Sequence, residues 1–308
     1  MDLQFIATDQ SLLTSIAEHR ILTVFQMTVL QRRSANALRR RLRLLRDEGL
    51  IAMTSRSLAG GQGRPENLIS LTESGVDLLK AKGVINTTVP GDHVTAAKLN
   101  CLDHEILIND FRVQLVQMSR VVPALKTRFL SPTSPLLPPC ADGRPLMPEK
   151  IRMDDRTDNT VGFIPDGVFA TTHEELGKTL LFFLEVDRGT EPLMRKRGSA
   201  QDVRQKVLQY QTLFDRDRYQ GYAKILECQL RGFRVLFLTD HPARLVALCR
   251  LVRETPPSDF IWLTDRGRMS SSGIWAPIWA RGGRDTEPLE SILGTRIPSP
   301  CPSPDTVA

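Results

Sequence analysis

The sequence lacks the features that mark disulfide-bonded, zinc-binding or membrane-spanning proteins. Only five of its 308 residues are cysteines, and no two form a Cys-x-x-Cys pair, so we expect neither a disulfide framework nor a zinc site. No apolar run is long enough to cross a bilayer, and the first residues, MDLQFIATDQ, lack the basic-then-apolar order of a signal peptide. These absences predict a cytoplasmic protein with no membrane partner.

The excess charge of the chain is positive and unevenly distributed. The formal net charge is +6 at pH 7, and seven arginines lie between Arg32 and Arg46. Such a concentration of cations suits a polyanionic partner, although net charge by itself does not identify one. At 308 residues the chain is also long enough to form two domains, each with its own core.

Residues 34–48 are expected to form a helix with one apolar and one basic face. Ser34 is suited to cap its amino terminus, and Leu38, Leu42 and Leu45 follow one another at helical spacing. At about 100° per residue the opposite face is basic, which is how helices present charge to the major groove of DNA. Arginine and asparagine can bind guanine and adenine through paired hydrogen bonds, and arginine also neutralises phosphate. The predicted DNA-binding residues are Asn36, Arg39, Arg40 and Arg43, with Arg32, Arg33 and Arg64 as further candidates.

The segments around this helix complete the pattern of a winged helix-turn-helix. Gly49 is placed to end the helix in a left-handed conformation, and Thr72 is placed to cap a following helix. Between them the sequence predicts two strands joined by a glycine-rich turn, which together form the wing. The predicted segments are helices at 12–17 and 23–30, strands at 51–55 and 68–71, and a turn at 60–65. Double-stranded DNA is the expected partner of residues 1–83, and the alternatives are a solvated helix face or a winged helix that contacts proteins.

The rest of the chain is expected to form a second domain, so that the fold class is α/β with two domains. A polar stretch with glycine and proline, residues 84–98, predicts a linker. Residues 99–285 then alternate between strands and helices, which favours a mostly parallel sheet covered by helices. The predicted elements are a helix at 99–118 that turns Leu102, Ile106, Phe111 and Leu115 toward the core, strands at 127–130, 162–170 and 179–187, a helix at 199–214, a strand at 234–239, a helix at 242–253 and a strand at 260–264. We expect a surface loop at 131–156, a final strand or turn at 273–280 and a disordered tail at 286–308.

Three acidic residues lie on two successive predicted strands. Asp166 follows a proline within the first strand, and Glu185 and Asp187 end the second on one face. If the two strands pair, the three carboxylates converge near a sheet edge. Oxygen ligands of this kind suit magnesium, and a metal held there activates water against a phosphodiester. The structural alternative is that these acids pair with nearby cations, which are Arg188, Arg195, Lys196 and Lys206.

These motifs resemble those of known families. The order helix, strand, strand with Pro-Asp, strand with Glu-x-Asp, helix, strand is similar to the restriction-endonuclease core with its Pro-Asp and (Asp/Glu)-x-Lys motif. More closely, IPDGVF, FFLEVDRGTE, LDHEIL and a helix with Lys206 and Tyr210, joined to a winged helix, resemble the replication-relaxation family over residues 12–279. Such proteins are encoded on bacterial plasmids and other mobile elements and are associated with plasmid replication and DNA relaxation. The resemblance implies a DNA-binding winged helix and a PD-(D/E)xK-like αβββαβ domain, with replication or mobilisation proteins, or a second copy of the chain, as further partners.

The chain departs from the nuclease motif at one position. Asp187 occupies the place of the motif lysine, whose charge steadies the attacking hydroxide and the transition state. Lys206 is the expected substitute in space. The predicted catalytic residues are therefore Asp166, Glu185, Asp187 and Lys206, and the three acids among them are the predicted magnesium ligands.

Other residues near these motifs carry weaker patterns. Glu105, on the first helix of the second domain, lies where some enzymes of this fold supply a further acid. His104 beside it is more typical of a hydrogen-bonded structural histidine than of a proton shuttle. Tyr210 is interpreted as a packing residue, because the sequence has no histidine cluster of the kind that positions metal in rolling-circle relaxases.

Three functions stay open on these residues. The first is a DNA-binding protein of a plasmid or other mobile element, whose nuclease-like domain processes DNA or assembles with partners. The second is an active magnesium-dependent nuclease or nickase, against which the missing motif lysine argues. The third is a winged-helix transcriptional regulator whose second domain senses a ligand or dimerises, although the sequence contains no glycine-rich phosphate loop.

Overall fold

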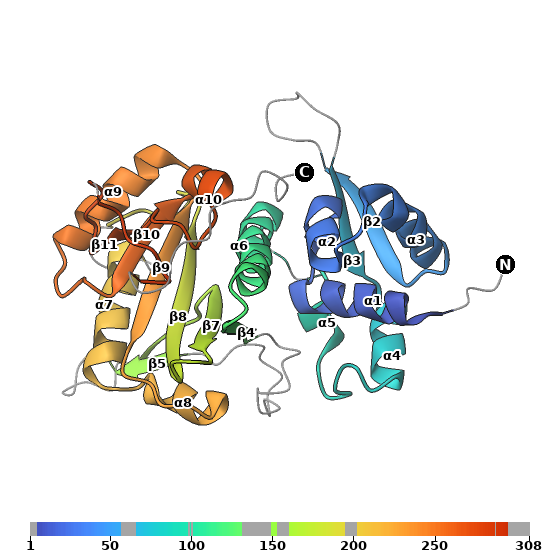
Figure 1. The fold of residues 1–308 in the computed structure, drawn as a ribbon, viewed down its shortest axis with the longest axis horizontal. Helices are drawn as coiled ribbons and strands as arrows, with labels where there is room; N and C mark the ends of the chain where they lie inside the picture. Colours follow the sequence, from blue (N-terminus) through green and yellow to red (C-terminus); the bar gives the residue numbers. More distant parts are fainter. Residues whose placement is uncertain are drawn as a thin grey trace. The chain divides into compact units, whose positions relative to one another are not determined.

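The structure is a mixed α/β fold in two compact units, each with its own sheet (Figure 1). The computed structural model describes residues 5–56, 66–97, 99, 101–130, 149–152, 160–194, 202–286 and 288–294. The first unit comprises Met1–Val113 with Ser131–Leu146, and the second comprises Gln114–Leu130 with Met147–Ala308. Within the described ranges, no helix combines the length and the apolar character needed to cross a membrane.

The first unit packs helices around a small antiparallel sheet of strand order β1-β3-β2. The predicted strands and helices are present, and the two-residue β1 and the short helix α5 are additions that sequence periodicity did not indicate. The elements are α1 (Ala7–His19), β1 (Leu22–Thr23), α2 (Val24–Gln31), α3 (Ala35–Asp47), β2 (Ile51–Arg56), β3 (Glu66–Leu71), α4 (Glu73–Ala81) and α5 (Gly91–Val94). The predicted turn at 60–65 lies outside the described residues. Thr72 caps α4 as expected, because its hydroxyl accepts a hydrogen bond from Gly75 N at 3.2 Å.

Residues predicted to form a linker belong instead to the first unit. Ile85 and Val94 are buried in the same core as the leucines of α1 and α3. The next helix, α6 (Leu102–Val121), is tied to this unit by Asn109, whose side-chain amide donates to the carbonyls of His19 at 3.0 Å and Ile21 at 2.7 Å. The compact unit therefore extends to Val113 rather than ending near residue 83.

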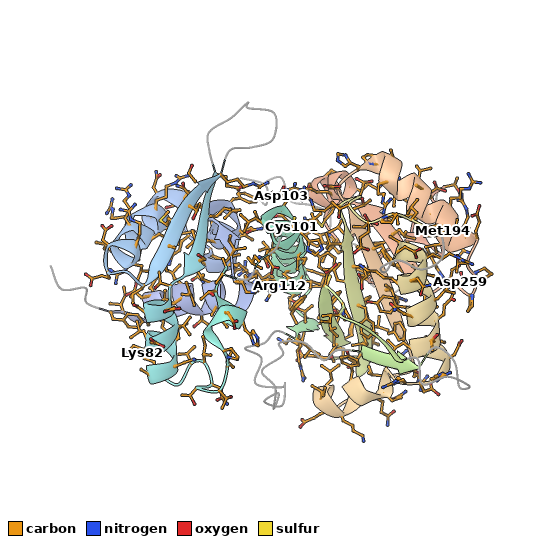
Figure 2. The ribbon with its side chains drawn as sticks, turned by 180° about the vertical axis from the view of Figure 1, so that it is seen from behind. Lys82, Cys101, Asp103, Arg112, Met194 and Asp259 are labelled. Carbon is orange, nitrogen blue, oxygen red and sulfur yellow. The ribbon has the colours of Figure 1, made fainter. Side chains whose placement is uncertain are left out.

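The buried face of helix α6 also differs from the predicted one. Phe111 and Leu115 are buried as expected, whereas Leu102 in the first turn is 40% exposed. Asp103 lies beside it at the amino-terminal end of α6, and Arg112 lies further along the helix (Figure 2). Asp103 forms an ion pair with Arg56 of β2. The first turn thus makes polar contacts with β2 and leaves Leu102 outside the core.

The second unit is built on a sheet of order β11-β10-β9-β8-β7-β4, with a separate pair β5-β6. Its strands are β4 (Leu125–Phe129), β5 (Glu149–Arg152), β6 (Thr160–Phe163), β7 (Gly167–His173), β8 (Lys178–Asp187), β9 (Phe233–Thr239), β10 (Ile261–Asp265) and β11 (Ala280–Arg281). Its helices are α7 (Val203–Asp215), α8 (Gln220–Leu226), α9 (Pro242–Arg253) and α10 (Arg266–Ser272), together with the last part of α6.

The large sheet is mixed, so the prediction of a mostly parallel sheet is wrong. Only β8–β9 and β9–β10 pair in parallel, whereas β4–β7, β7–β8 and β10–β11 are antiparallel. The reason lies in the connections. A short turn that contains Gly177 in a left-handed conformation, with φ of +58°, joins β7 directly to β8. Strands joined by so short a turn must run antiparallel, because a parallel pair needs a crossover of about a dozen residues.

Helices cover both faces of this sheet (Figure 1). Phe183 of β8 packs against Tyr210 of α7, with ring centroids 5.4 Å apart, whereas Phe182 on the opposite face lines a cavity with Met118 of α6. Residues 181–187 of β8 are all buried. The run LLFFLEVD is thus covered on both sides from Leu181 onward, whereas its first residue, Leu180, is 41% exposed. Polar side chains in this strand must therefore find partners within the protein.

Two further differences concern segment boundaries. The strand predicted at 162–170 is divided into β6 and β7 by Pro165, because proline has no N–H to donate to a ladder. The segment predicted as a final strand or turn at 273–280 is mostly turn, and the strand that pairs with β10 is limited to Ala280–Arg281. The disordered tail predicted at 286–308 lies largely outside the described residues, as does the predicted loop at 131–156 except for residues 149–152.

Candidate functional site

Helix α3 has the two faces that its sequence predicts. Ser34 Oγ accepts a hydrogen bond from Ala37 N at 3.4 Å, and the three leucines at 38, 42 and 45 are almost fully buried. Gly49 has a φ of +71°, and its N–H donates to Arg46 O while Leu50 N donates to Leu45 O. These two bonds form a Schellman motif, which closes the helix and directs the chain into β2.

The outer face of α3 is a basic surface, which we define by Asn36, Arg39, Arg40 and Arg43. All four side chains are exposed, and Arg39 donates to the side-chain oxygen of Asn36 at 3.4 Å. Neither Arg40 nor Arg43 forms an ion pair with another residue that the structure describes. The positive charge of this face is therefore available to a partner.

The remaining arginines predicted to bind DNA have different positions. Arg32 is exposed and ends α2 in a left-handed conformation with φ of +52°. Arg33 is also exposed and donates to the Thr8 hydroxyl at 3.1 Å. Arg64 lies outside the described residues.

Arg41 is the one arginine of α3 that the fold uses internally among those with described side chains. It forms a two-pronged ion pair with Asp9 of α1, a fully buried carboxylate that also accepts from Ile6 N at 2.8 Å. Sequence reasoning missed this pair, since nothing in the spacing links positions 9 and 41. The pair fixes α3 against α1 and so orients the basic surface.

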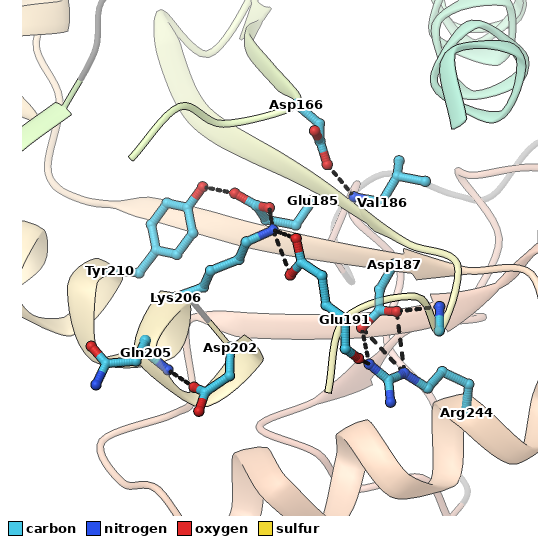
Figure 3. Close-up of polar contacts among 11 residues, drawn as sticks. Asp166, Glu185, Val186, Asp187, Glu191, Asp202, Gln205, Lys206, Tyr210 and Arg244 are labelled. Carbon is cyan, nitrogen blue, oxygen red and sulfur yellow. Dashed lines mark hydrogen bonds and ion pairs between the residues drawn. The ribbon is translucent and has the colours of Figure 1, made fainter. Parts of the chain in front are cut away.

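The pairing of β7 with β8 brings the predicted acidic residues to one end of the sheet (Figure 3). Gly167 lies opposite Leu184, so Asp166 just before β7 reaches the end of β8, where its Oδ2 accepts from Val186 N at 2.8 Å. Glycine at position 167 leaves room for the ring of Phe129, because a Cβ there would lie 2.8 Å from that ring and force it to shift.

Glu185 is buried at the centre of this group and is neutralised by α7. Tyr210 donates its hydroxyl hydrogen to Glu185 Oε1 at 2.6 Å, and Lys206 Nζ donates to Glu185 Oε2 at 3.2 Å. Lys206 also lies 3.1 Å from a carboxylate oxygen of Glu191. The four-residue spacing of Lys206 and Tyr210 places both on one face of the helix, toward β8.

The surroundings of Glu185 shift its protonation. Burial raises the pKa of Glu185 to about 7, and the Asp166 carboxylate acts in the same direction, while Lys206 and the Tyr210 hydrogen bond oppose this change. Burial also raises the pKa of Tyr210, and the Glu185 carboxylate adds to this effect, so the phenol keeps its proton. For Lys206, burial lowers the pKa, but Glu185 and the other acids outweigh it and the net direction is upward.

Asp187 is turned to a different partner. Its carboxylate binds Arg244 of α9 through contacts of 2.7 and 3.2 Å and accepts from Gly189 N at 2.6 Å. Arg244 also donates to the carbonyl of Glu191 at 2.6 Å. Sequence reasoning did not identify Arg244, because this residue lies 57 positions after Asp187 and local spacing does not link the two. Arg188, which was considered as a partner for these acids, pairs with Asp240 at 3.4 Å.

The three predicted magnesium ligands are not arranged as a metal site. Glu185 is bound by Lys206 and Tyr210, and Asp187 is bound by Arg244. Among the residues described by the structure, no three histidine, cysteine, aspartate or glutamate side chains lie together in a way that could hold a metal ion. The residues therefore do not fit a three-carboxylate magnesium site as they stand. They form a chain of acid–base pairs that joins β8 to α7 and α9.

Other residues considered from the sequence fall in different surroundings. Tyr210 packs against Phe183 as expected, and its hydroxyl bond to Glu185 adds a polar role that the packing interpretation missed. Glu105 belongs to the part of α6 in the first unit, where its charge raises the pKa of Arg112 against the lowering effect of burial.

Comparison with known proteins identifies a family. The family model described as replication-relaxation matches residues 13–227, which is more than half of the chain. No curated protein and no solved structure matches the chain significantly.

Proposed function

Since the chain belongs to the replication-relaxation family, we propose that it is a DNA-binding protein of a plasmid or other mobile element. In this proposal the first unit is a winged helix-turn-helix that targets double-stranded DNA. The second unit is a PD-(D/E)xK-like domain, which acts at the target by contact and assembly.

The observation that carries the proposal is the basic surface of α3. Asn36, Arg39, Arg40 and Arg43 are exposed, and α3 leads through a tight cap into the antiparallel pair β2–β3. Helices and strands in this order are typical of winged helices, in which the helix before the wing enters the major groove. The pair between Arg41 and the buried carboxylate of Asp9 supports this role, because it holds α3 at a fixed rotation with its basic face outward.

The test measures the affinity of the protein for a mixed-sequence DNA duplex by fluorescence anisotropy at several salt concentrations. We expect the change Arg39→Ala with Arg43→Ala to weaken binding by about tenfold or more, because two phosphate or base contacts are lost. The slope of log K against log salt should also fall in magnitude by about two.

The matched control is Arg46→Ala with Arg250→Ala, which removes the same charge from two exposed arginines that bond Asp47 and Glu254. This control should bind DNA nearly as the wild type does. Equal losses in both double variants would indicate a general charge effect and would contradict the assignment of α3 to the groove.

For the second unit, the acid–base pairs favour assembly over cleavage. The order α6, β4, β7, β8, α7, β9 supports a PD-(D/E)xK-like core. However, Glu185 and Asp187 are each neutralised by a cation of the chain. Buried pairs of this kind keep acids within the fold without a metal. We therefore propose that this domain binds DNA or partner proteins.

A second candidate function is a magnesium-dependent nuclease or nickase. The observation in its favour is that Lys206 lies beside Glu185, where it could replace the lysine missing from position 187. Supercoiled DNA incubated with magnesium and the protein decides between the two. Under our proposal the wild type leaves the DNA supercoiled.

The cleavage assay includes Asp166→Ala and Glu185→Ala, with Asp259→Ala as an exposed control outside the site. Nicking by the wild type and by the control, but by neither site variant, would replace our proposal with the nuclease function. Nicking that survives both site substitutions would come from elsewhere and would remove these acids from the chemistry.

A further inference from the structure

The second unit contains an apolar cavity at the end of the β7–β8 hairpin that lies away from Asp166 and Glu185. Its volume is about 300 Å³. The walls come from α6, from the sheet and from the segment that follows β11. The lining residues that matter here are Met118, Thr171, His173, Leu176, Lys178 and Leu180.

The rim of this cavity exposes apolar side chains that water solvates poorly. Leu176 is 50% exposed and Leu180 is 41% exposed, while Met118 and Phe182 in the wall are fully buried. A ligand that entered the cavity would cover the two exposed leucines. Covering apolar surface is favourable in proportion to the area removed from water.

The same hairpin supplies polar groups beside this apolar opening. Lys178, an exposed cation, lies directly opposite His173 in the strand register. Leu176 N donates to His173 Nδ1 at 3.3 Å, so the neutral ring carries its hydrogen on Nε2 and can donate from there. In the wall, the Thr171 hydroxyl oxygen is buried and makes no hydrogen bond to any described residue.

The acids of the hairpin leave the lysine charge available. The Glu174 carboxylate forms its ion pair with Lys126 of β4, at 3.8 Å, rather than with Lys178. Glu175 is exposed in the turn. An anion at the rim can therefore accept hydrogen bonds from Lys178 and His173.

From these groups we propose that the cavity binds an aliphatic carboxylate of medium chain length. At roughly 30 Å³ for each water-sized group, the volume accommodates about ten methylene groups. The chain would fill the apolar cavity and cover Leu176 and Leu180, and the carboxylate would be bound by Lys178 and His173. This site is independent of the DNA-binding proposal and shares no residue with it.

The test is titration calorimetry of the full-length protein with decanoate, 1-decanol and butyrate, at concentrations below micelle formation. Decanoate should bind saturably with one molecule per chain, decanol more weakly, and butyrate not measurably. Leu180→Gln should lower the affinity for both decanoate and decanol by about tenfold, because it places an amide at the apolar rim. Lys178→Gln should lower the affinity for decanoate by about threefold and leave the affinity for decanol unchanged.

Both substituted side chains are exposed, so the variants should fold as the wild type does. The control is Val246→Gln, which changes an apolar residue of α9 that is 57% exposed and lies outside the cavity, and it should leave binding unchanged. Several results would overturn the proposal: no saturable decanoate binding, butyrate binding as strong as that of decanoate, or decanoate affinity unaffected by Leu180→Gln or by Lys178→Gln.

Discussion

At the scale of single residues, the protonation of Glu185 is coupled to the free energy of unfolding. Burial raises its pKa from 4.5 to about 7. Between these two values the folded protein binds more protons than the unfolded chain, so the free energy of unfolding falls as the pH rises. This contribution is fully present below about pH 4.5 and is lost as the pH passes through about 7.

The pH dependence of unfolding should therefore change in Glu185→Gln. We expect the stability of the wild type relative to this variant to decline by up to about 3 kcal/mol between pH 4.5 and 7, at about 1.4 kcal/mol per pKa unit. Urea denaturation of both proteins across this range measures the difference. Parallel stability curves would show that Glu185 does not titrate in this window.

Arg244 is a second residue whose loss has a definite expected effect. Arg244→Ala leaves the Asp187 carboxylate, which is 8% exposed, without its guanidinium partner. The expected cost is about 3–5 kcal/mol, because an unpaired charge stays buried. Adding Asp187→Asn should recover part of the loss, since the charge is removed.

The control for this pair is Arg250→Ala, which breaks an exposed pair with Glu254 and should cost less than about 1 kcal/mol. Denaturation midpoints of the single and double variants compare them. If Asp187→Asn made Arg244→Ala still less stable, the pair would not be the source of the cost.

The limits of sequence reasoning at this scale follow from the nature of ion pairs. Strand periodicity placed Glu185 and Asp187 on one face, and that face does meet helices. The sequence offered Lys206 as one of four candidate cations for these acids without assigning it to Glu185, and it did not offer Arg244 at all. Such pairings depend on how helices 20 to 60 residues later in the chain pack on the sheet, which local spacing does not encode.

At the scale of elements, two glycines of the first unit make different demands. Gly49 needs its left-handed conformation, but a Cβ there would meet no atom within 4 Å. Gly75 in α4 has ordinary helical geometry, yet a Cβ there would lie 2.2 Å from the Leu50 carbonyl oxygen. That oxygen is fixed by a bond from Thr72 N.

Alanine at these positions should therefore cost different amounts. Gly49→Ala is expected to lower stability by about 1 kcal/mol through backbone strain. Gly75→Ala is expected to cost more, about 2–3 kcal/mol, because two backbone segments must separate. Thermal unfolding of both variants measures the order, and a larger loss for Gly49→Ala would contradict the close packing of α4 on Leu50.

Elements with strong local patterns were predicted well, and those without were missed. Helix α9 has the bounds that the sequence predicted, and the leucine stripe of α3 is buried. Helix α10 was missed, since its sequence RGRMSSS buries only Met269 and offers no apolar period. The helix is capped by Asp265, whose side chain accepts a hydrogen bond from Arg268 N. The sequence did not indicate this cap, because an aspartate after an apolar strand has many other possible roles.

At the scale of the whole molecule, the boundary of the first unit has a measurable consequence. Ile106 of α6 packs with Ile21 and Leu68, and Gln26 donates to the Ile106 carbonyl at 3.2 Å. A fragment 1–121 should therefore unfold cooperatively and at a higher temperature than a fragment 1–97. Circular dichroism during heating tests this, with Asn109→Ala in the longer fragment as a variant expected to lose part of the gain. Equal melting of the two fragments would restore the shorter boundary.

The division into two α/β parts was predictable because it depends on composition and on the order of elements. The place of the boundary was not. Glycine and proline in residues 84–98 are typical of a linker, but Ile85 and Val94 within it pack into the first core. Such isolated apolar residues carry no period, so burial of this kind emerges only from the tertiary arrangement.

Strand β8 finally has a consequence for how the second unit opens. It lies between β7 and β9, and its last seven residues are buried on both faces. Its backbone amides can therefore exchange hydrogen with solvent only when the sheet itself comes apart. In heavy water, the amide signals of this strand should persist longest in the unit, and their exchange rates should report its global free energy of opening.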